Sequence, residues 1–161
     1  KLSDYKKRAK VQKFKAIKFT KSIHKLCIKN NIRVRYAKTL KKGPILNVIK
    51  KVKPELIVLG GGYHEKLTRE FLKIPTLGVI NSHPSKLPLY RGTDVHRWQI
   101  LNKVKLSGLT IHLVDRSFDT GNIISFKKVK INKHETPQGL VKNISKISGK
   151  LMLKTLETIT S

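Results

Sequence analysis

The sequence lacks what a disulfide-bonded, zinc-binding or membrane-spanning protein needs. Cys27 is the only cysteine among 161 residues, so neither an internal disulfide nor a cysteine-based metal cage can form. No apolar run approaches the ~18 residues of a membrane span, and the N-terminus carries no apolar stretch typical of a secretory signal. We therefore predict a cytoplasmic protein with no resident metal and no membrane partner.

Acidic residues are also scarce, because 9 Asp and Glu stand against 36 Lys and Arg, for a formal net charge of +27. Residues 1–54 hold 19 basic residues and 1 acidic residue, residues 55–126 hold 9 and 6, and residues 127–161 hold 8 and 2. Hydrophobic residues make up 39% of the chain, which is enough for a core and excludes a disordered polycation. The middle of the chain is nearly balanced in charge, so its chemistry has to be inferred from its motifs.

The spacing of apolar residues predicts helices that alternate with strands. Helices are expected over about 1–30, 45–52 and 65–72, after Thr93, and over 137–158. Strands are expected over 32–36 and 56–59, from Gly78 through the residues before Pro84, and over 109–114 and 123–131. This alternation is typical of the α/β class with a mostly parallel sheet, which here ends in an antiparallel hairpin.

Three polar side chains follow the apolar strands of this predicted sheet. Asn81 and His83 are two residues apart at the end of a strand, so their side chains share one face. Asp119 lies at a second strand-to-turn junction, and ligands of α/β sheets bind beyond the carboxyl ends of the strands. In acyl transfer to an amine, Asn81 and a protonated His83 can stabilise the oxyanion, while Asp119 raises the His83 pKa and helps remove the amine proton. Taken alone, the same residues equally fit a structural histidine and a turn-capping aspartate.

The order of the sequence blocks around these residues is more specific than their spacing. Asn81 to Gly92 reads NSHPSKLPLYRG, followed by WQIL at 98–101, GLTIH at 108–112 and DTGNII at 119–124. In this order the blocks closely resemble the folate-dependent formyltransferases, a family that acts on ribonucleotide, methionyl-tRNA or sugar amines. The resemblance implies a Rossmann-like three-layer α/β fold, 10-formyltetrahydrofolate as the formyl donor, and Asn81, His83 and Asp119 as catalytic residues.

The resemblance also implies a folate pocket and a domain organisation. Family members line this pocket at the positions of Leu59, Tyr63, His64, Val114 and Asp115. The family fold opens with a strand and a phosphate-binding loop. No segment before the first predicted helix matches them, so we expect the fold to lack its first strand. We predict a single formyltransferase catalytic domain over 1–161, with a basic flank (1–54), a catalytic core (55–131) and a C-terminal helix (132–161).

The identity of the amine acceptor is a finer question. His112 in Thr-Ile-His is more typical of the ribonucleotide and sugar enzymes of the family than of the tRNA enzyme. We therefore expect a small phosphorylated amine as the acceptor, as in the phosphoribosylglycinamide formyltransferases of purine biosynthesis. Methionyl-tRNA and a sugar amine are the alternative acceptors. A nucleic-acid partner is not favoured. A hypothesis of another class is that the chain is an inactive remnant that binds nucleic acid. The charge of residues 1–54 favours this hypothesis, and the same charge equally fits helix faces exposed to solvent.

Overall fold

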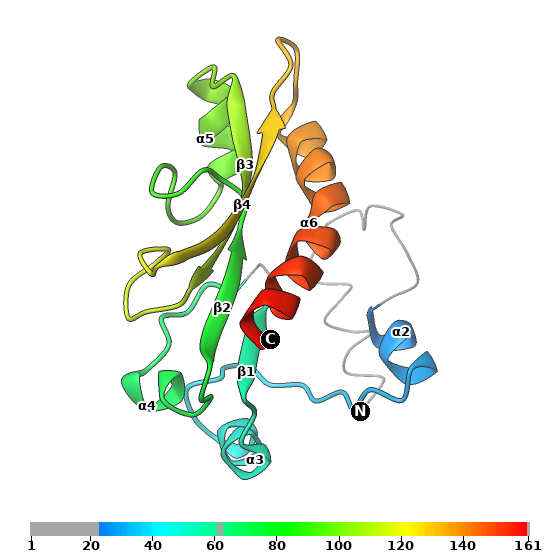
Figure 1. The fold of residues 1–161 in the computed structure, drawn as a ribbon, viewed down its shortest axis with the longest axis vertical. Coiled ribbons are helices and arrows are strands. Elements are labelled where there is room, and N and C mark those ends of the chain that lie inside the picture. Colours follow the sequence, from blue (N-terminus) through cyan, green and yellow to red (C-terminus); the bar gives the residue numbers. More distant parts are fainter. Residues whose placement is uncertain (1–22, 61–62, 161) are drawn as a thin grey trace. The chain divides into compact units, whose positions relative to one another are not determined.

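The computed structural model describes residues 23–60 and 63–160 (Figure 1). The chain divides into two compact units, Lys1–Tyr36 and Ala37–Ser161. The described part of the first unit contains α2 (Ile23–Lys29), while the expected helix over residues 1–22 lies outside the described residues. Residues 32–36 form no strand, contrary to the prediction, because they pair with no strand among the described residues. No helix in the described ranges is long and apolar enough to cross a membrane.

The described part of the second unit contains a four-stranded sheet in the order β1-β2-β3-β4. Its strands are β1 (Leu56–Leu59), β2 (Gly78–His83), β3 (Leu106–Leu113) and β4 (Ile123–Lys130). The α/β class is confirmed, but the sheet is mixed rather than mostly parallel, since β1 pairs with β2 in parallel and the other two pairs are antiparallel. Apolar runs do not encode strand direction, which explains the error. The prediction of a missing first strand involves residues outside the described ranges and stays a prediction.

Four helices accompany this sheet within the same described residues: α3 (Pro44–Val52), α4 (Arg69–Leu72), α5 (Val95–Leu101) and α6 (Pro137–Thr160). Pro44 occupies the first turn of α3, where its missing N–H costs no hydrogen bond. Helix α4 is shorter than expected, because the Thr68 hydroxyl caps it by accepting a hydrogen bond from Phe71 N at 3.2 Å. Asp94, rather than Thr93, directly precedes α5.

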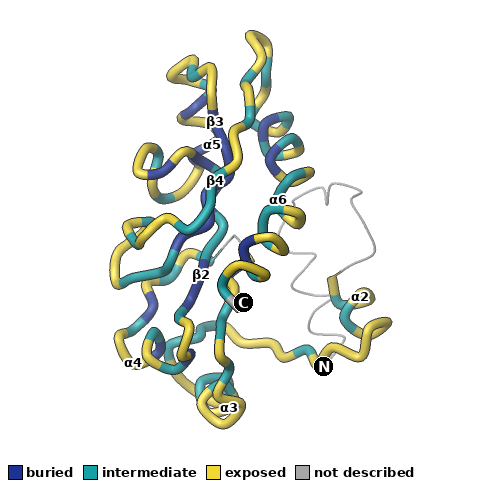
Figure 2. Tube along the Cα trace, in the orientation of Figure 1, coloured by how far each residue is buried: buried dark blue, intermediate teal, exposed yellow. Residues whose placement is uncertain are grey.

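Helices pack on both faces of the sheet and give the unit three layers (Figure 1). On one face, Leu109 of β3 packs with Leu140 and Ile144 of α6. On the other face, Val79 of β2 packs with Phe71 of α4. Figure 2 shows that burial is concentrated along β2 and β3 and along the sheet-facing side of α6. The buried middle strands therefore form a rigid base for the residues at their ends.

Candidate active site

The end of β2 and the loop after β3 bring the three predicted catalytic residues together. Asn81 pairs in register with His112 of β3, and His83 pairs with Thr110, so Asn81, His83 and His112 share one face of the sheet. Asp119 comes from the loop between β3 and β4 and has a positive φ of 54°, a conformation that Asp tolerates better than most residues. The side chains of His83 and Asp119 are only 5% and 10% exposed.

Asp119 lies at the centre of this cluster. Its Oδ2 accepts a hydrogen bond from Gly92 N at 2.8 Å and lies 3.4 Å from His83 Nδ1. Its Oδ1 lies 3.4 Å from His112 Nε2 and 3.5 Å from the Asn81 amide nitrogen. The same amide nitrogen is 3.4 Å from His112 Nε2. Because most N–H···O bonds are 2.7–3.2 Å long, the Asn81 amide is weakly engaged and can donate to a bound group.

Backbone carbonyls determine which ring nitrogen of each histidine carries the proton. His83 Nε2 donates to the carbonyl oxygen of Tyr90 at 2.6 Å, and His112 Nδ1 donates to that of Leu113 at 2.7 Å. In neutral His83, Nδ1 therefore presents a lone pair to Asp119. A proton taken up by His83 goes to Nδ1, directly beside the carboxylate.

The pKa values at the site differ from the expectation for His83. Burial lowers the pKa of His83 below its usual value, and outweighs the hydrogen bond to Tyr90 and the charge of Asp119, which both raise it. Burial raises the pKa of Asp119, but the contacts with His112 and the Gly92 N–H outweigh it, so this pKa is lowered. The site thus holds a neutral imidazole beside a carboxylate, instead of the protonated His83 that was expected. The expectation differed because the sequence does not show how deeply the ring is buried.

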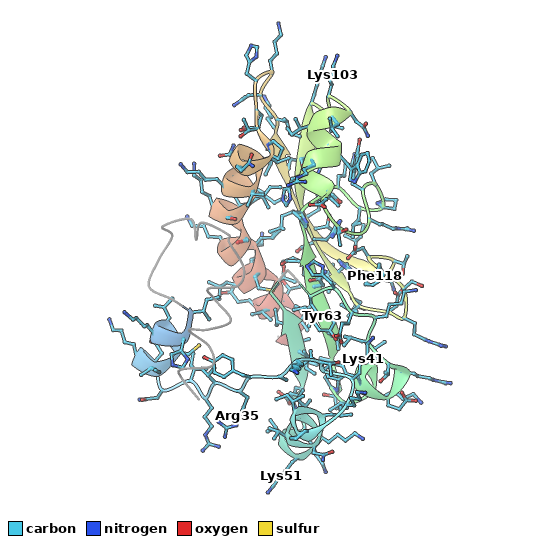
Figure 3. The ribbon with its side chains drawn as sticks, turned by 180° about the vertical axis from the view of Figure 1, so that it is seen from behind. Arg35, Lys41, Lys51, Tyr63, Lys103 and Phe118 are labelled. Carbon is cyan, nitrogen blue, oxygen red and sulfur yellow. The ribbon has the colours of Figure 1, made fainter. Side chains whose placement is uncertain are left out.

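A cavity of about 620 Å³ opens beside this cluster. Asn81, His83 and Asp119 line it, as do Tyr63 and His64, two of the predicted folate-binding residues. Phe118 and Tyr63, which are labelled in Figure 3, add aromatic surface to the lining. Burial, together with the charge of Glu65 and a hydrogen bond to it, raises the pKa of Tyr63 to about 12, so the phenol stays neutral. The cavity has the size and mixed lining of a small-molecule site.

Three other predicted folate-binding residues do not line this cavity. Leu59 is 9% exposed and belongs to the core, where Val114 packs against it. The Asp115 carboxylate accepts hydrogen bonds from Ser117 N at 2.9 Å and from the Thr120 hydroxyl at 2.6 Å. The contact of these three residues with a folate stays a prediction.

The structure adds residues to the predicted site. His112 was not among the predicted catalytic residues, yet its Nε2 lies 3.4 Å from both the Asn81 amide nitrogen and Asp119 Oδ1. His96 lines the cavity, and so do Ser145 and Ser148 of α6. The two-residue spacing of Thr110 and His112 along β3 was a sequence signal for the position of His112, since it places both side chains on one face of the strand. The contribution of α6 had no signal in the local sequence.

This arrangement defines an α/β protein with an amide, an imidazole and a carboxylate in the lining of a small-molecule cavity, and with the imidazole of His112 beside the carboxylate. Comparison with known proteins identifies the family: the formyl transferase family model matches residues 4–156. The chain therefore belongs to the formyl transferase family, as the three sequence blocks predicted, and the Rossmann-like fold is confirmed.

Individual relatives within the family differ in what their names describe. The chain is 34% identical over 88% of its length to the bifunctional polymyxin resistance protein ArnA of Wigglesworthia glossinidia brevipalpis. It is also 34% identical over 85% of its length to a methionyl-tRNA formyltransferase of Halothermothrix orenii. Among solved structures, a phosphoribosylglycinamide formyltransferase from Bacillus halodurans matches 73% of the chain, with 31% identity and a TM-score of 0.67. The chain covers only 21%, 43% and 60% of these three proteins.

Proposed function

We propose that this chain carries the catalytic centre of an N-formyltransferase, which moves the formyl group of 10-formyltetrahydrofolate to a primary amine. The observation that supports it most is the joint placement of Asn81, His83 and Asp119 on the rim of one cavity. Each of the three side chains has a chemical role in amide formation. Membership of the formyl transferase family supports the same reaction class.

The residues around the cavity fit a folate donor. Tyr63 and Phe118 offer aromatic surface to a flat ring system, and the weakly engaged Asn81 amide lies within the same cavity. The charge balance of residues 55–126 leaves an excess of basic residues, which suits the carboxylates of a folate tail. We assign donor contacts to Tyr63 and His64, and structural support of the same pocket to Leu59, Val114 and Asp115.

When bound, the donor supplies a formyl carbon to which the acceptor nitrogen bonds, while the bond from that carbon to the folate nitrogen breaks. Asn81 donates a hydrogen bond to the oxygen that becomes negative as the carbon turns tetrahedral. The pair formed by Asp119 and neutral His83 accepts the proton lost by the amine and returns it to the leaving nitrogen. The accepted proton would lie between Asp119 Oδ2 and His83 Nδ1, which are 3.4 Å apart.

A small phosphorylated amine is the first candidate acceptor. The supporting observation is the likeness to a phosphoribosylglycinamide formyltransferase structure at 31% identity and a TM-score of 0.67. Ser145 and Ser148 of α6 line the cavity and offer hydroxyl groups to the hydroxyls of such an acceptor. On this assignment the reaction belongs to purine biosynthesis in the cytoplasm.

Methionyl-tRNA is the second candidate acceptor. It is favoured by the methionyl-tRNA formyltransferase of Halothermothrix orenii, which is 34% identical over 138 residues. The relative named ArnA at the same identity keeps a sugar amine as an alternative. All three acceptors present a primary amine to the same residues, so the reaction chemistry is common to them.

The test is a turnover assay with purified chain, 10-formyltetrahydrofolate and one acceptor at a time. We expect release of tetrahydrofolate that depends on one acceptor class: phosphoribosylglycinamide, methionyl-tRNA or an amino sugar nucleotide. An Asn81→Ala variant should retain the fold and lose about 10² to 10³ in rate, the scale of a lost oxyanion donor. Turnover that is independent of any amine, or unchanged in Asn81→Ala, would contradict the proposal.

A further inference from the structure

Helix α6 carries an unbroken row of four lysines, which we call the lysine row: Lys142, Lys146, Lys150 and Lys154. All four are exposed. Their spacing of four residues places them about 6 Å apart along the helix axis, over about 18 Å in total. The helix therefore presents a line of regularly spaced positive charges to solvent.

The lysine row lies away from the cavity. Successive residues turn an α-helix by about 100°, so Leu140, Ile144 and Leu151 form the side that packs on the sheet. The cavity-lining residues Ser145 and Ser148 project on one side of that stripe, and the lysines project on the other. A partner bound to the lysine row leaves the cavity open.

No acidic partner neutralises the row within the described residues. Neither ion pair found in those ranges involves a lysine of α6. Glu157 is the only acidic residue of α6, and Glu135, before the helix, accepts a hydrogen bond from Asn143 Nδ2 at 3.0 Å. Like charges four residues apart destabilise a helix, whereas a merely solvated face usually intersperses Glu with Lys. The row has an intrinsic cost, which an external anion would relieve.

A further exposed lysine lies on the sheet. Lys127 of β4 pairs in register with Leu109, whose side chain packs on α6, so Lys127 is on the face of the sheet that α6 covers. Lys127 is also exposed. Helix α6 contains no aromatic residue and no Arg, the groups that stack on unpaired bases. The surface therefore suits contacts with backbone phosphates and not with bases.

We propose that the lysine row binds the phosphodiester backbone of double-stranded RNA. A line of point charges at a regular spacing complements a line of phosphates, and a folded RNA is one of the acceptors considered above. The choice of RNA as the partner rests on methionyl-tRNA, the second candidate acceptor of the proposed function. The binding of phosphates by the lysine row does not depend on whether the chain is catalytically active. Leu153 is the only large apolar side chain strongly exposed on the described part of α6, which is too little for a membrane anchor.

The test compares two variants of the full chain with equal loss of charge. The row variant carries Lys142→Gln, Lys146→Gln, Lys150→Gln and Lys154→Gln, and the control variant carries Lys50→Gln, Lys51→Gln, Lys73→Gln and Lys103→Gln at exposed positions elsewhere. Fluorescence anisotropy measures binding to a labelled RNA duplex over a range of salt concentrations. Each phosphate contact contributes about 0.9 to the slope of log K against log salt.

We expect the row variant to bind at least about tenfold more weakly at low salt, with a slope smaller by about 3 to 4. The control variant should keep the slope of the unmodified chain. An Arg version of the row should restore binding, because its charge is unchanged, and thermal unfolding should show that both Gln variants fold. Since no turnover is measured, a failure here is separate from a failure of the formyltransferase proposal.

Four results would overturn the inference. Equal weakening in both Gln variants would assign RNA binding to total charge, and no weakening in the row variant would exclude the row. Row-dependent binding that is tighter to a DNA duplex of the same sequence, or that occurs with phosphatidylserine vesicles and not with RNA, would assign the surface to another partner.

Discussion

Replacing Asp119 by Asn separates the charge of this residue from its shape. Asparagine keeps an oxygen that can accept the hydrogen bond from Gly92 N, which is 2.8 Å long in the native protein. Its amide nitrogen takes the place of Oδ1, which lies 3.4 Å from His112 Nε2 and 3.5 Å from the Asn81 amide nitrogen. The strong contact with Gly92 is preserved and only these long contacts change, so we expect the free energy of unfolding near neutral pH to change by about 1 kcal/mol at most.

The same substitution removes the proton acceptor of the proposed reaction. General base catalysis contributes about 10² to 10⁴ in rate, so the barrier should rise by about 3 to 5 kcal/mol. The charge of Asp119 also raises the pKa of His83, and its loss should lower that pKa further. Nuclear magnetic resonance of the imidazole protons measures this shift, and the turnover assay measures the rate.

A matched control is Glu55→Gln, which removes one negative charge at an exposed position before β1. The control should keep the native rate and the native His83 titration. If Asp119→Asn kept its rate within about threefold of the native protein while remaining folded, the role of the carboxylate would be refuted. An unchanged His83 titration would refute the electrostatic coupling of the pair.

Three further predictions concern folding. Gly121→Ala places a methyl group against the Leu113 carbonyl oxygen, and thermal unfolding should show a destabilisation of about 1 to 3 kcal/mol, whereas an unchanged midpoint would contradict this close approach. Leu140→Ala should cost about 2 to 5 kcal/mol in urea unfolding, because Leu140 is fully buried between α6 and the sheet. The control Leu153→Ala, at a 62% exposed site of the same helix, should stay within about 0.5 kcal/mol of the native protein. Because the pKa of His83 is lower in the folded state than its usual 6.5, protonation favours the unfolded chain, so stability should fall as the pH drops below 6.5. This loss should be smaller in His83→Asn, and an equal loss would show that other groups cause it.

The elements with strong local signals could be predicted from the sequence. The apolar run at 56–59 matches β1 residue for residue, and the helix expected over 137–158 begins at Pro137, as α6 does. The segment 32–36 has the alternation of a strand and forms none, because a strand also needs a partner. The local pattern of apolar and polar residues predicts which side of a segment is apolar, whereas strand pairing depends on the segments that lie beside it.

The candidate site shows the same division. Asn81 and His83 could be predicted, because both lie on one strand and their spacing decides their common face. The participation of His112 depends on the antiparallel register of β2 and β3, which no local pattern encodes. The neutral state of His83 depends on burial by segments remote in sequence, so the predicted protonated form was wrong.

The most direct test of the central claim is a single turnover with an isotopically labelled formyl group on the folate donor. Mass spectrometry of the acceptor then reports whether the label has moved to the amine. The proposal predicts a labelled formamide with the native chain, and about 10²-fold or greater loss of its rate of formation with Asn81→Ala and with Asp119→Asn. A label that appears only as free formate, or a formamide formed equally fast by the variants, would contradict an N-formyltransferase built on these residues.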